Sequence, residues 1–151
     1  MGSITIETRI RAAIDVCFDA ARDVSLHVQS AAFSRERLVA PGRLEGLLQL
    51  GDLVCFEGRH FGIRQRFCAR ITELDRPYRF VDEMVRGMFK SMRHIHAFEG
   101  TEGGTLMRDL VTWEAPFGWI ADALFLERHM RWFVETKQKR LKELVERREK
   151  V

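Results

Sequence analysis

Two histidines and two aspartates are the residues of this sequence best suited to chemistry. His94 and His96 lie two positions apart, and Phe98 continues the same spacing. Because alternate residues of a β-strand share one face, the three side chains point the same way, and Phe98 indicates that this face is buried. Asp82 lies in the segment before and Asp109 in the segment after, each separated from the histidines by a turn signal. Strand pairing across these turns would bring the carboxylates beside the imidazoles.

The lengths of the two turns predict which residues face the histidines. A turn over 100–104 sets His94 opposite Asp109, and the preceding turn sets His96 opposite Asp82. Partners at such positions have Cβ atoms within about 5 Å of each other. A slip of one residue would send the side chains to opposite faces, so the predicted polar cluster depends on these registers.

Three interpretations of this cluster remain open. The first is a structural network, in which His–Asp pairs neutralise buried charge and fix the strand register. The second is a patch that orients a ligand within an apolar pocket. The third is catalysis or metal binding, since histidine and aspartate ligate zinc or iron and a His–Asp pair can act as a general base. We favour the first interpretation and expect no metal and no cofactor, because neither a nucleophile nor a clear third ligand accompanies the pattern. If the chain is an enzyme, Asp82, His94, His96 and Asp109 are the catalytic candidates.

The elements that would position these residues follow a simple order along the chain. Residues 3–11 alternate between apolar and polar, as expected of a half-buried strand, and segments 15–22 and 23–32 have helical spacing, with Asp23 or Ser25 as a cap. Further strands are expected at 37–40, 53–61, 63–74, 78–86, 91–99 and 105–115, separated by Gly, Pro and Asp. Short connections between consecutive strands predict an antiparallel meander.

The C-terminal segment predicts a long amphipathic helix that reaches about residue 150. Apolar residues recur there at helical spacing, and the stripe includes Phe133, Lys137 and Leu141. A helix of more than 25 residues must bury this stripe on something of similar length, and the sheet is the only candidate. We therefore predict an α+β fold in which a curved antiparallel sheet wraps a C-terminal helix, as one domain over residues 1–151.

Five short segments resemble a known superfamily. They are Phe80-Val81-Asp82-Glu83, Gly87-Met88-Phe89-Lys90, His94-Ile95-His96-Ala97-Phe98, Gly104-Thr105-Leu106-Met107-Arg108-Asp109 and Pro116-Phe117-Gly118. In this order they resemble bacterial members of the START/Bet v 1-like (SRPBCC) superfamily with the pattern F-x-D-E, G-P-F, H-x-H-x-F, G-T-x-M-x-D and P-F-G. Met88 replaces the usual proline, a departure confined to a turn. The resemblance covers nearly the whole chain and implies a helix-grip fold with an internal pocket. Relatives bind lipids, sterols, plant hormones or polyketides, and some are cyclases.

Large apolar side chains dominate the predicted inner faces. The chain has eleven Phe against one Tyr, and flexible methionines suit a wall that adapts to an apolar guest. We predict the pocket entrance near Trp113 to Trp119, where the sheet passes to the helix. The predicted ligand-binding residues are Phe56, His60, Phe67, Phe80, Met84, His94, His96, Met107, Val111, Trp113, Met130 and Phe133.

The composition of the chain argues against nucleic acid and membranes as binding partners. The net charge of +3 is small, and the basic segment 137–140 is followed by Glu143 and Glu146, which we interpret as a solvated helix face and not a nucleic-acid site. No apolar run approaches the roughly 18 residues of a membrane span, so no integral membrane association is expected. Three cysteines without metal-type spacing predict buried free thiols in a reducing cytoplasm.

Two functions follow as hypotheses. The leading one is the binding of a hydrophobic small molecule, such as a lipid, isoprenoid, polyketide or aromatic metabolite, by a monomer or homodimer. The alternative is a polyketide cyclase, aromatase or dehydratase-like enzyme that uses the pocket His and Asp groups. Fold resemblance alone does not decide between them.

Overall fold

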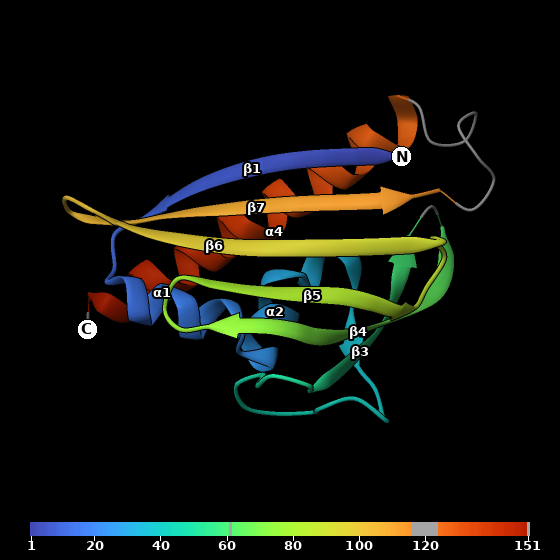
Figure 1. Cartoon of the computed structure of the whole chain (residues 1–151), viewed down its shortest axis with the longest axis horizontal. Coiled ribbons are helices and arrows are strands. Elements are labelled where there is room, and N and C mark those ends of the chain that lie inside the picture. The colour runs from blue at the N-terminus through green and yellow to red at the C-terminus, as the bar shows by residue number, and fades with distance from the viewer. Residues whose placement is uncertain (61, 116–123, 151) are drawn as a thin grey trace.

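Seven antiparallel strands form one sheet in the part of the chain that the structure describes, residues 1–60, 62–115 and 124–150 of a computed structural model (Figure 1). The strands lie side by side in the order β1-β7-β6-β5-β4-β3-β2. Their bounds are β1 Gly2–Ile10, β2 Arg37–Leu38, β3 Leu53–His60, β4 Ile63–Asp75, β5 Arg79–Arg86, β6 Ser91–Thr101 and β7 Gly104–Glu114. The predicted meander is confirmed, although the strand expected at 37–40 has only two residues.

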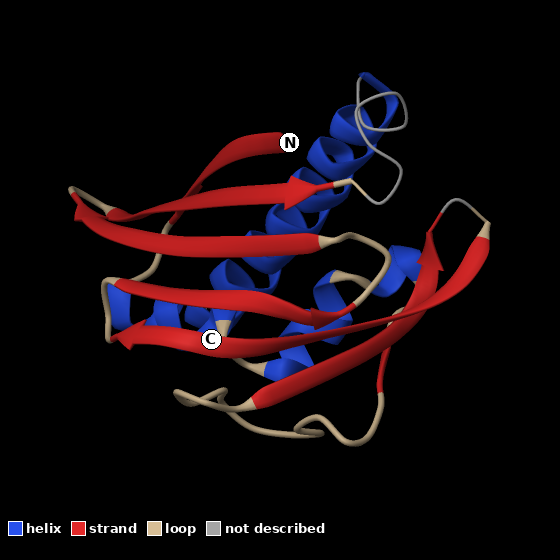
Figure 2. Cartoon of the chain, turned by 45° about the vertical axis from the view of Figure 1, so that its right-hand side comes forward, coloured by secondary structure: helices blue, strands red, loops and turns tan. Residues whose placement is uncertain are grey.

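The helices pack on one face of this sheet (Figure 2). They are α1 Ile14–Ala21, α2 Val24–Ser30 and the 26-residue α4 Leu124–Glu149, with a short 3-10 turn, η1, at Ala32–Ser34. The carboxylate of Asp23 accepts hydrogen bonds from the amides of Ser25 and Leu26, which confirms Asp23 as the predicted cap of α2. No helix in the described ranges is both long and apolar enough to cross a membrane.

The buried apolar side chains of α4 divide between two clusters. Leu141 and Val145 pack with Phe18 and the sheet residue Phe80 in one cluster, while Val134 packs with the second cluster around Trp113. The sheet curves over both clusters and α4 runs along its inner face (Figures 1 and 2). The predicted helix-grip α+β fold is therefore confirmed. The expected start of the long helix and the expected entrance at Trp119 fall within 116–123, outside the described residues.

Two of the three cysteines form a disulfide, so the prediction of three free thiols was wrong. Cys17 is free and buried, as expected, but Cys55 and Cys68 are bonded. The reason is the pairing of β3 with β4, which sets Cys55 directly opposite Cys68 with a Cα–Cα distance of 4.1 Å. The cytoplasmic location was inferred from three free thiols, so it loses this support and stays a prediction.

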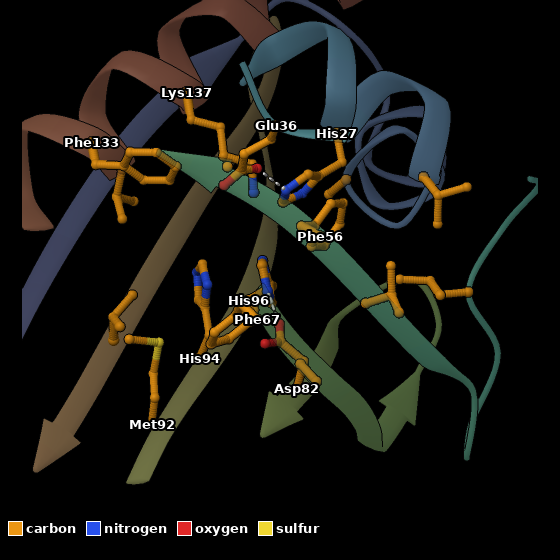
Figure 3. Close-up of a pocket in the computed structure, with 18 of the residues that line it drawn as sticks. His27, Glu36, Phe56, Phe67, Asp82, Met92, His94, His96, Phe133 and Lys137 are labelled. Carbon is orange, nitrogen blue, oxygen red and sulfur yellow. Dashed lines mark hydrogen bonds and ion pairs between the residues drawn. The ribbon is translucent and has the colours of Figure 1, made fainter. Parts of the chain in front are cut away.

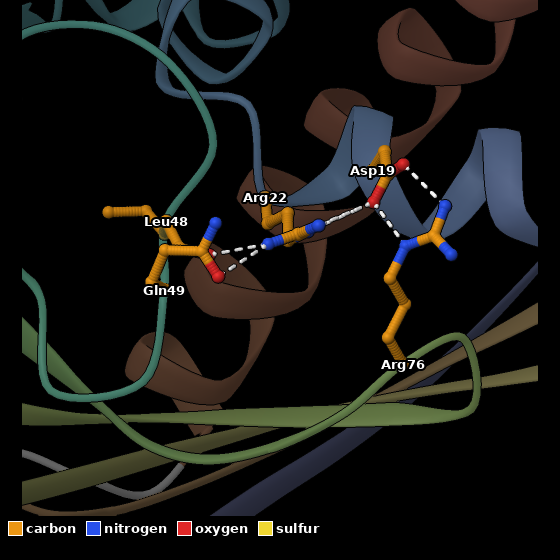
Figure 4. Close-up of polar contacts among 5 residues, drawn as sticks. All are labelled: Asp19, Arg22, Leu48, Gln49 and Arg76. Carbon is orange, nitrogen blue, oxygen red and sulfur yellow. Dashed lines mark hydrogen bonds and ion pairs between the residues drawn. The ribbon is translucent and has the colours of Figure 1, made fainter.

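A buried arginine joins three segments at the end of α1 (Figure 4). The Arg22 guanidinium donates to the carbonyl oxygen of Leu48 at 3.0 Å and to the carboxylate of Asp19 at 2.8 Å. Arg76, in the turn between β4 and β5, donates to the same carboxylate at 2.7 Å. This hydrogen bond, together with those from Arg22, holds the pKa of Asp19 below its ordinary value despite partial burial. The network fixes α1 against the loop that carries Leu48 and against the sheet.

Candidate functional site

A cavity of about 150 Å³ lies between the sheet, α2 and α4 (Figure 3). Eight of the residues predicted to bind a ligand line it, namely Phe56, Phe67, Phe80, His94, His96, Val111, Met130 and Phe133. Further wall residues come from the turn before β6 and from β6 itself: Met88, Phe89 and Met92. Met88 and Phe89 were missed because a turn gives no periodic signal that its side chains point inward, whereas Met92 was missed although it shares the strand face of His94 and His96.

Three predicted residues do not reach the described wall of the cavity. Met107 is fully buried within the first apolar cluster, and Trp113 covers Gly2, where an added Cβ would meet its ring at 2.3 Å. Met84 packs against the turn at Gly87. These side chains pack against neighbouring residues in the structure, and their role in ligand binding stays a prediction. The side chain of His60 lies outside the described residues.

The four polar residues predicted to cluster do come together. His94 Nε2 lies 2.8 Å from Asp109 Oδ1, and His96 Nε2 lies 2.8 Å from Asp82 Oδ2. His96 Nδ1 lies 3.2 Å from the same oxygen of Asp109. The two imidazole rings stack, with their centroids 3.7 Å apart. We call these four residues the His–Asp tetrad; Asp82, His94 and His96 line the cavity, and Asp109 is fully buried behind them.

Both predicted registers were wrong by two residues, yet the tetrad forms. The sheet pairs His96 with Asp109 and His94 with Asp82, where the sequence had suggested the opposite partners. A shift of two residues keeps every side chain on the same face. The predicted hydrogen bonds therefore form, but each joins a histidine to an aspartate two positions away from the residue directly opposite it on the neighbouring strand.

The two histidines of the tetrad have pKa values shifted in opposite directions. Burial opposes the charged imidazolium, but hydrogen bonds to Asp109 and Asp82 outweigh burial and raise the pKa of His96. The contact of His96 with Asp82 lowers the pKa of Asp82 despite burial, and the contacts of His94 and His96 with Asp109 likewise lower the pKa of Asp109. Burial and the neighbouring charge of His96 lower the pKa of His94. The neutral form of His94 is therefore favoured at the cavity wall, beside His96, whose charged form is favoured by its two carboxylate partners.

The helix α4 contributes a further hydrogen bond to the tetrad. Gln138 is almost fully buried and donates from Nε2 to Asp109 Oδ1 at 3.0 Å. Gln138 and its neighbour Lys137 are both buried, so the interpretation of 137–140 as a solvated face was wrong for these two residues. The signal was available, because Lys137 has the helical spacing of the buried Val134 and Leu141.

Part of the tetrad has the composition of a metal site. Asp82, His94 and His96 each offer one ligand atom, and these atoms lie within 4.8 Å of one another. Such a set suits zinc or iron. Asp82 and His96 are hydrogen-bonded to each other here, so a metal would have to displace the proton between them. The expected absence of a metal stays a prediction.

A second polar group borders the cavity near α2. His27 Nε2 lies 3.3 Å from Glu36 Oε2, and the His27 ring stacks on Phe56 with centroids 4.2 Å apart. Lys137 reaches from α4 toward this pair (Figure 3). Burial, followed by the charge of Lys137, lowers the pKa of His27 to about 4. His27 is therefore neutral at pH 7 and can donate Nε2–H to Glu36.

The lowered pKa of His27 predicts a stability change in acid. Above its ordinary pKa of 6.5 the residue is neutral in both states, and between pH 6.5 and about 4 only the unfolded chain binds the proton. We expect the free energy of unfolding to fall by roughly 1–3 kcal/mol across this range because of His27 alone. Urea denaturation from pH 7.5 to 4 should show this loss in the wild type and a smaller loss in His27→Gln, which keeps a donor for Glu36. If the free energy of unfolding falls equally with pH in both proteins, the loss of stability in acid does not come from His27.

The fold is shared with solved structures of low sequence identity. The Thermus thermophilus protein TTHA0849 has a TM-score of 0.75 and 17% identity, over 95% of this chain and 97% of that chain. Ara h 8.0201 has a TM-score of 0.71 and 13% identity, over 95% and 97% of the chains. Major latex-like protein 151 from Panax ginseng has a TM-score of 0.70 and 15% identity, over 94% and 95%. No protein-family model and no curated protein matches the sequence. These likenesses show that the chain shares the fold of these structures and nothing beyond the fold.

Proposed function

We propose that this protein binds a small hydrophobic molecule in the cavity between the sheet and α4. The observation that supports the proposal is the wall itself. Apolar residues, with Phe, Val and Met the most frequent, make up more than half of it, and its polar groups include two clusters, three residues of the tetrad and the His27–Glu36 pair with Lys137. A few convergent polar groups in an apolar cavity are typical of sites that bind and orient a ligand.

The size of the cavity favours a compact guest. An apolar protein cavity of about 150 Å³ admits benzene, so a single ring or a short chain fits without movement of the wall. Met88, Met92 and Met130 line the cavity, and their unbranched side chains can change rotamer to admit a longer molecule. Aromatic metabolites and short lipid-like or isoprenoid chains therefore fit better than a rigid polycyclic molecule.

Native mass spectrometry of the protein purified from its own host tests the proposal. We expect the folded chain to carry one small molecule that organic extraction releases. Extraction after denaturation should identify it as a mainly apolar compound. A folded protein with the mass of the chain alone, which also takes up no added hydrophobic molecule in a saturable manner, would contradict the proposal.

A second candidate is acid–base catalysis at His94, which lines the cavity and hydrogen-bonds to Asp109. A neutral imidazole oriented by a carboxylate is the arrangement of a general base. Incubation with the wild type should then convert the extracted molecule into a different compound. His94→Phe should bind the molecule without converting it. Recovery of an unaltered molecule from the wild type would favour binding alone.

A further inference from the structure

The ammonium group of Lys137 lies in the cavity wall without a partner. Its residue is only 9% exposed, and no described residue forms a hydrogen bond or a close ion pair with it. Two other cationic residues of the wall are paired, since Arg22 bonds Asp19 at 2.8 Å and Arg66 bonds Glu57 at 3.0 Å. Arg22 and Arg66 thus each contact a carboxylate, whereas no carboxylate lies within ion-pair distance of Lys137 among the described residues.

The carboxylates nearest to Lys137 already have donors. Glu36 interacts with His27, while Asp82 and Asp109 interact with His96. These three carboxylates favour the charged form of Lys137, but burial outweighs them and lowers the pKa of its ammonium. A buried charge without a close partner costs several kcal/mol in a folded protein. This cost disappears when an anion enters the cavity beside the lysine.

We propose that the ligand is a monocarboxylic acid whose carboxylate pairs with Lys137. The inference rests on the proposed function and specifies the chemistry of its ligand. The apolar body of the acid lies along the Phe and Met wall toward His94, on the other side of the cavity (Figure 3). Because Glu36 and Asp82 also line the cavity, a dianion such as a phosphate ester would meet repulsion that a single carboxylate largely avoids.

Pairs of acids and amides of the same shape test this inference. Benzoate, trans-cinnamate and octanoate, each with its primary amide, would be titrated by calorimetry at pH 7 into the wild type, Lys137→Met and Lys139→Met. Lys139 is exposed two residues further along the same helix and serves as the matched control. We expect the wild type and Lys139→Met to bind the best-fitting acid about tenfold more tightly than its amide. Lys137→Met should bind both equally, with the amide affinity unchanged.

The outcomes separate the inference from the proposed function. Equal binding of acid and amide by the wild type, or a preference for the acid that survives in Lys137→Met, overturns the inference and leaves the proposed function standing. Absence of binding for all six probes overturns both. Thermal unfolding without probe provides a second measurement, because methionine of similar length removes an unpaired buried charge. We expect Lys137→Met to melt no lower than the wild type; a clearly lower Tm would mean that the lysine has a structural partner, and would overturn the inference.

Discussion

Replacement of Asp109 by alanine is expected to lower the free energy of unfolding by about 3–5 kcal/mol. The carboxylate is fully buried, and its Oδ1 lies within 3.2 Å of donor atoms on His94, His96 and Gln138. Removal leaves these groups in the protein interior without their acceptor, and it leaves His96 with Asp82 as its remaining carboxylate partner. The effect should be among the largest that one substitution produces in this chain.

Urea denaturation with unchanged slope would measure the loss, and Glu114→Ala provides the control. Glu114 lies on the same strand, is half exposed and approaches Lys90 at only 3.7 Å, so its removal should cost less than about 1 kcal/mol. The NMR titration of His96 in Asp109→Ala should also show a lower pKa than in the wild type. A loss as small as that of the control would contradict the view that the tetrad stabilises the sheet.

Replacement of Ala69 by phenylalanine is expected to weaken ligand binding by about 100-fold or more, since full loss of a well-filled apolar contact removes several kcal/mol. Ala69 is almost fully buried on the cavity wall, where a benzyl group would occupy much of the 150 Å³. The matched control is Ala97→Phe. Ala97 lies between His96 and Phe98 in β6 and therefore points to the opposite face of the sheet.

Calorimetry with the best-fitting amide probe would compare these two variants with the wild type. We expect Ala97→Phe to bind normally. Overpacking of the wall costs about 1–3 kcal/mol, so circular dichroism would establish that Ala69→Phe is folded at the temperature of the titration. If it is not, the smaller Ala69→Leu takes its place. Undiminished binding in a folded wall variant would place the ligand somewhere other than this cavity.

The layout of the fold could be predicted from the sequence because each element has a strong local signal. Alternation defined β1, the Asp23 cap defined the start of α2, and the apolar stripe of α4 required a long partner. The composition of the tetrad was also predictable, because His94 and His96 share a strand face whatever the exact register is.

The registers could not be predicted, because they depend on how the turns close. The sequence suggested a five-residue turn over 100–104, but β6 and β7 pair as far as Thr101 and Gly104. Only two residues then form the turn, and Gly103 adopts a φ of +86°, which glycine accepts without strain. This turn is centred one residue further along the chain than the pairing of His94 with Asp109 requires, so the partner of each β6 residue moves by two. The Cys55–Cys68 disulfide was missed for a related reason, since it follows from the β3–β4 register.

Lys137 and Gln138 were misjudged because a charged segment was assessed by its composition. The helical phase places both residues with Val134 and Leu141, on the side of α4 that faces the sheet and the cavity. Glu36, which follows η1 in an irregular segment, had no sequence signal at all. Glu36 and Lys137 lie on separate elements, so their proximity at the cavity follows only from the packing of these elements.

Methyl NMR of the six methionines would show whether a small hydrophobic molecule enters the cavity. Met88, Met92 and Met130 line the cavity, whereas Met107 is fully buried in the first apolar cluster and Met1 is exposed. With methyl-labelled methionine and toluene as a neutral probe, we expect saturable chemical-shift changes for the three wall methyls and unchanged signals for Met1 and Met107. Shifts confined to Met1, or no saturable shift at any of the wall methyls, would contradict the claim that this cavity receives a small hydrophobic molecule.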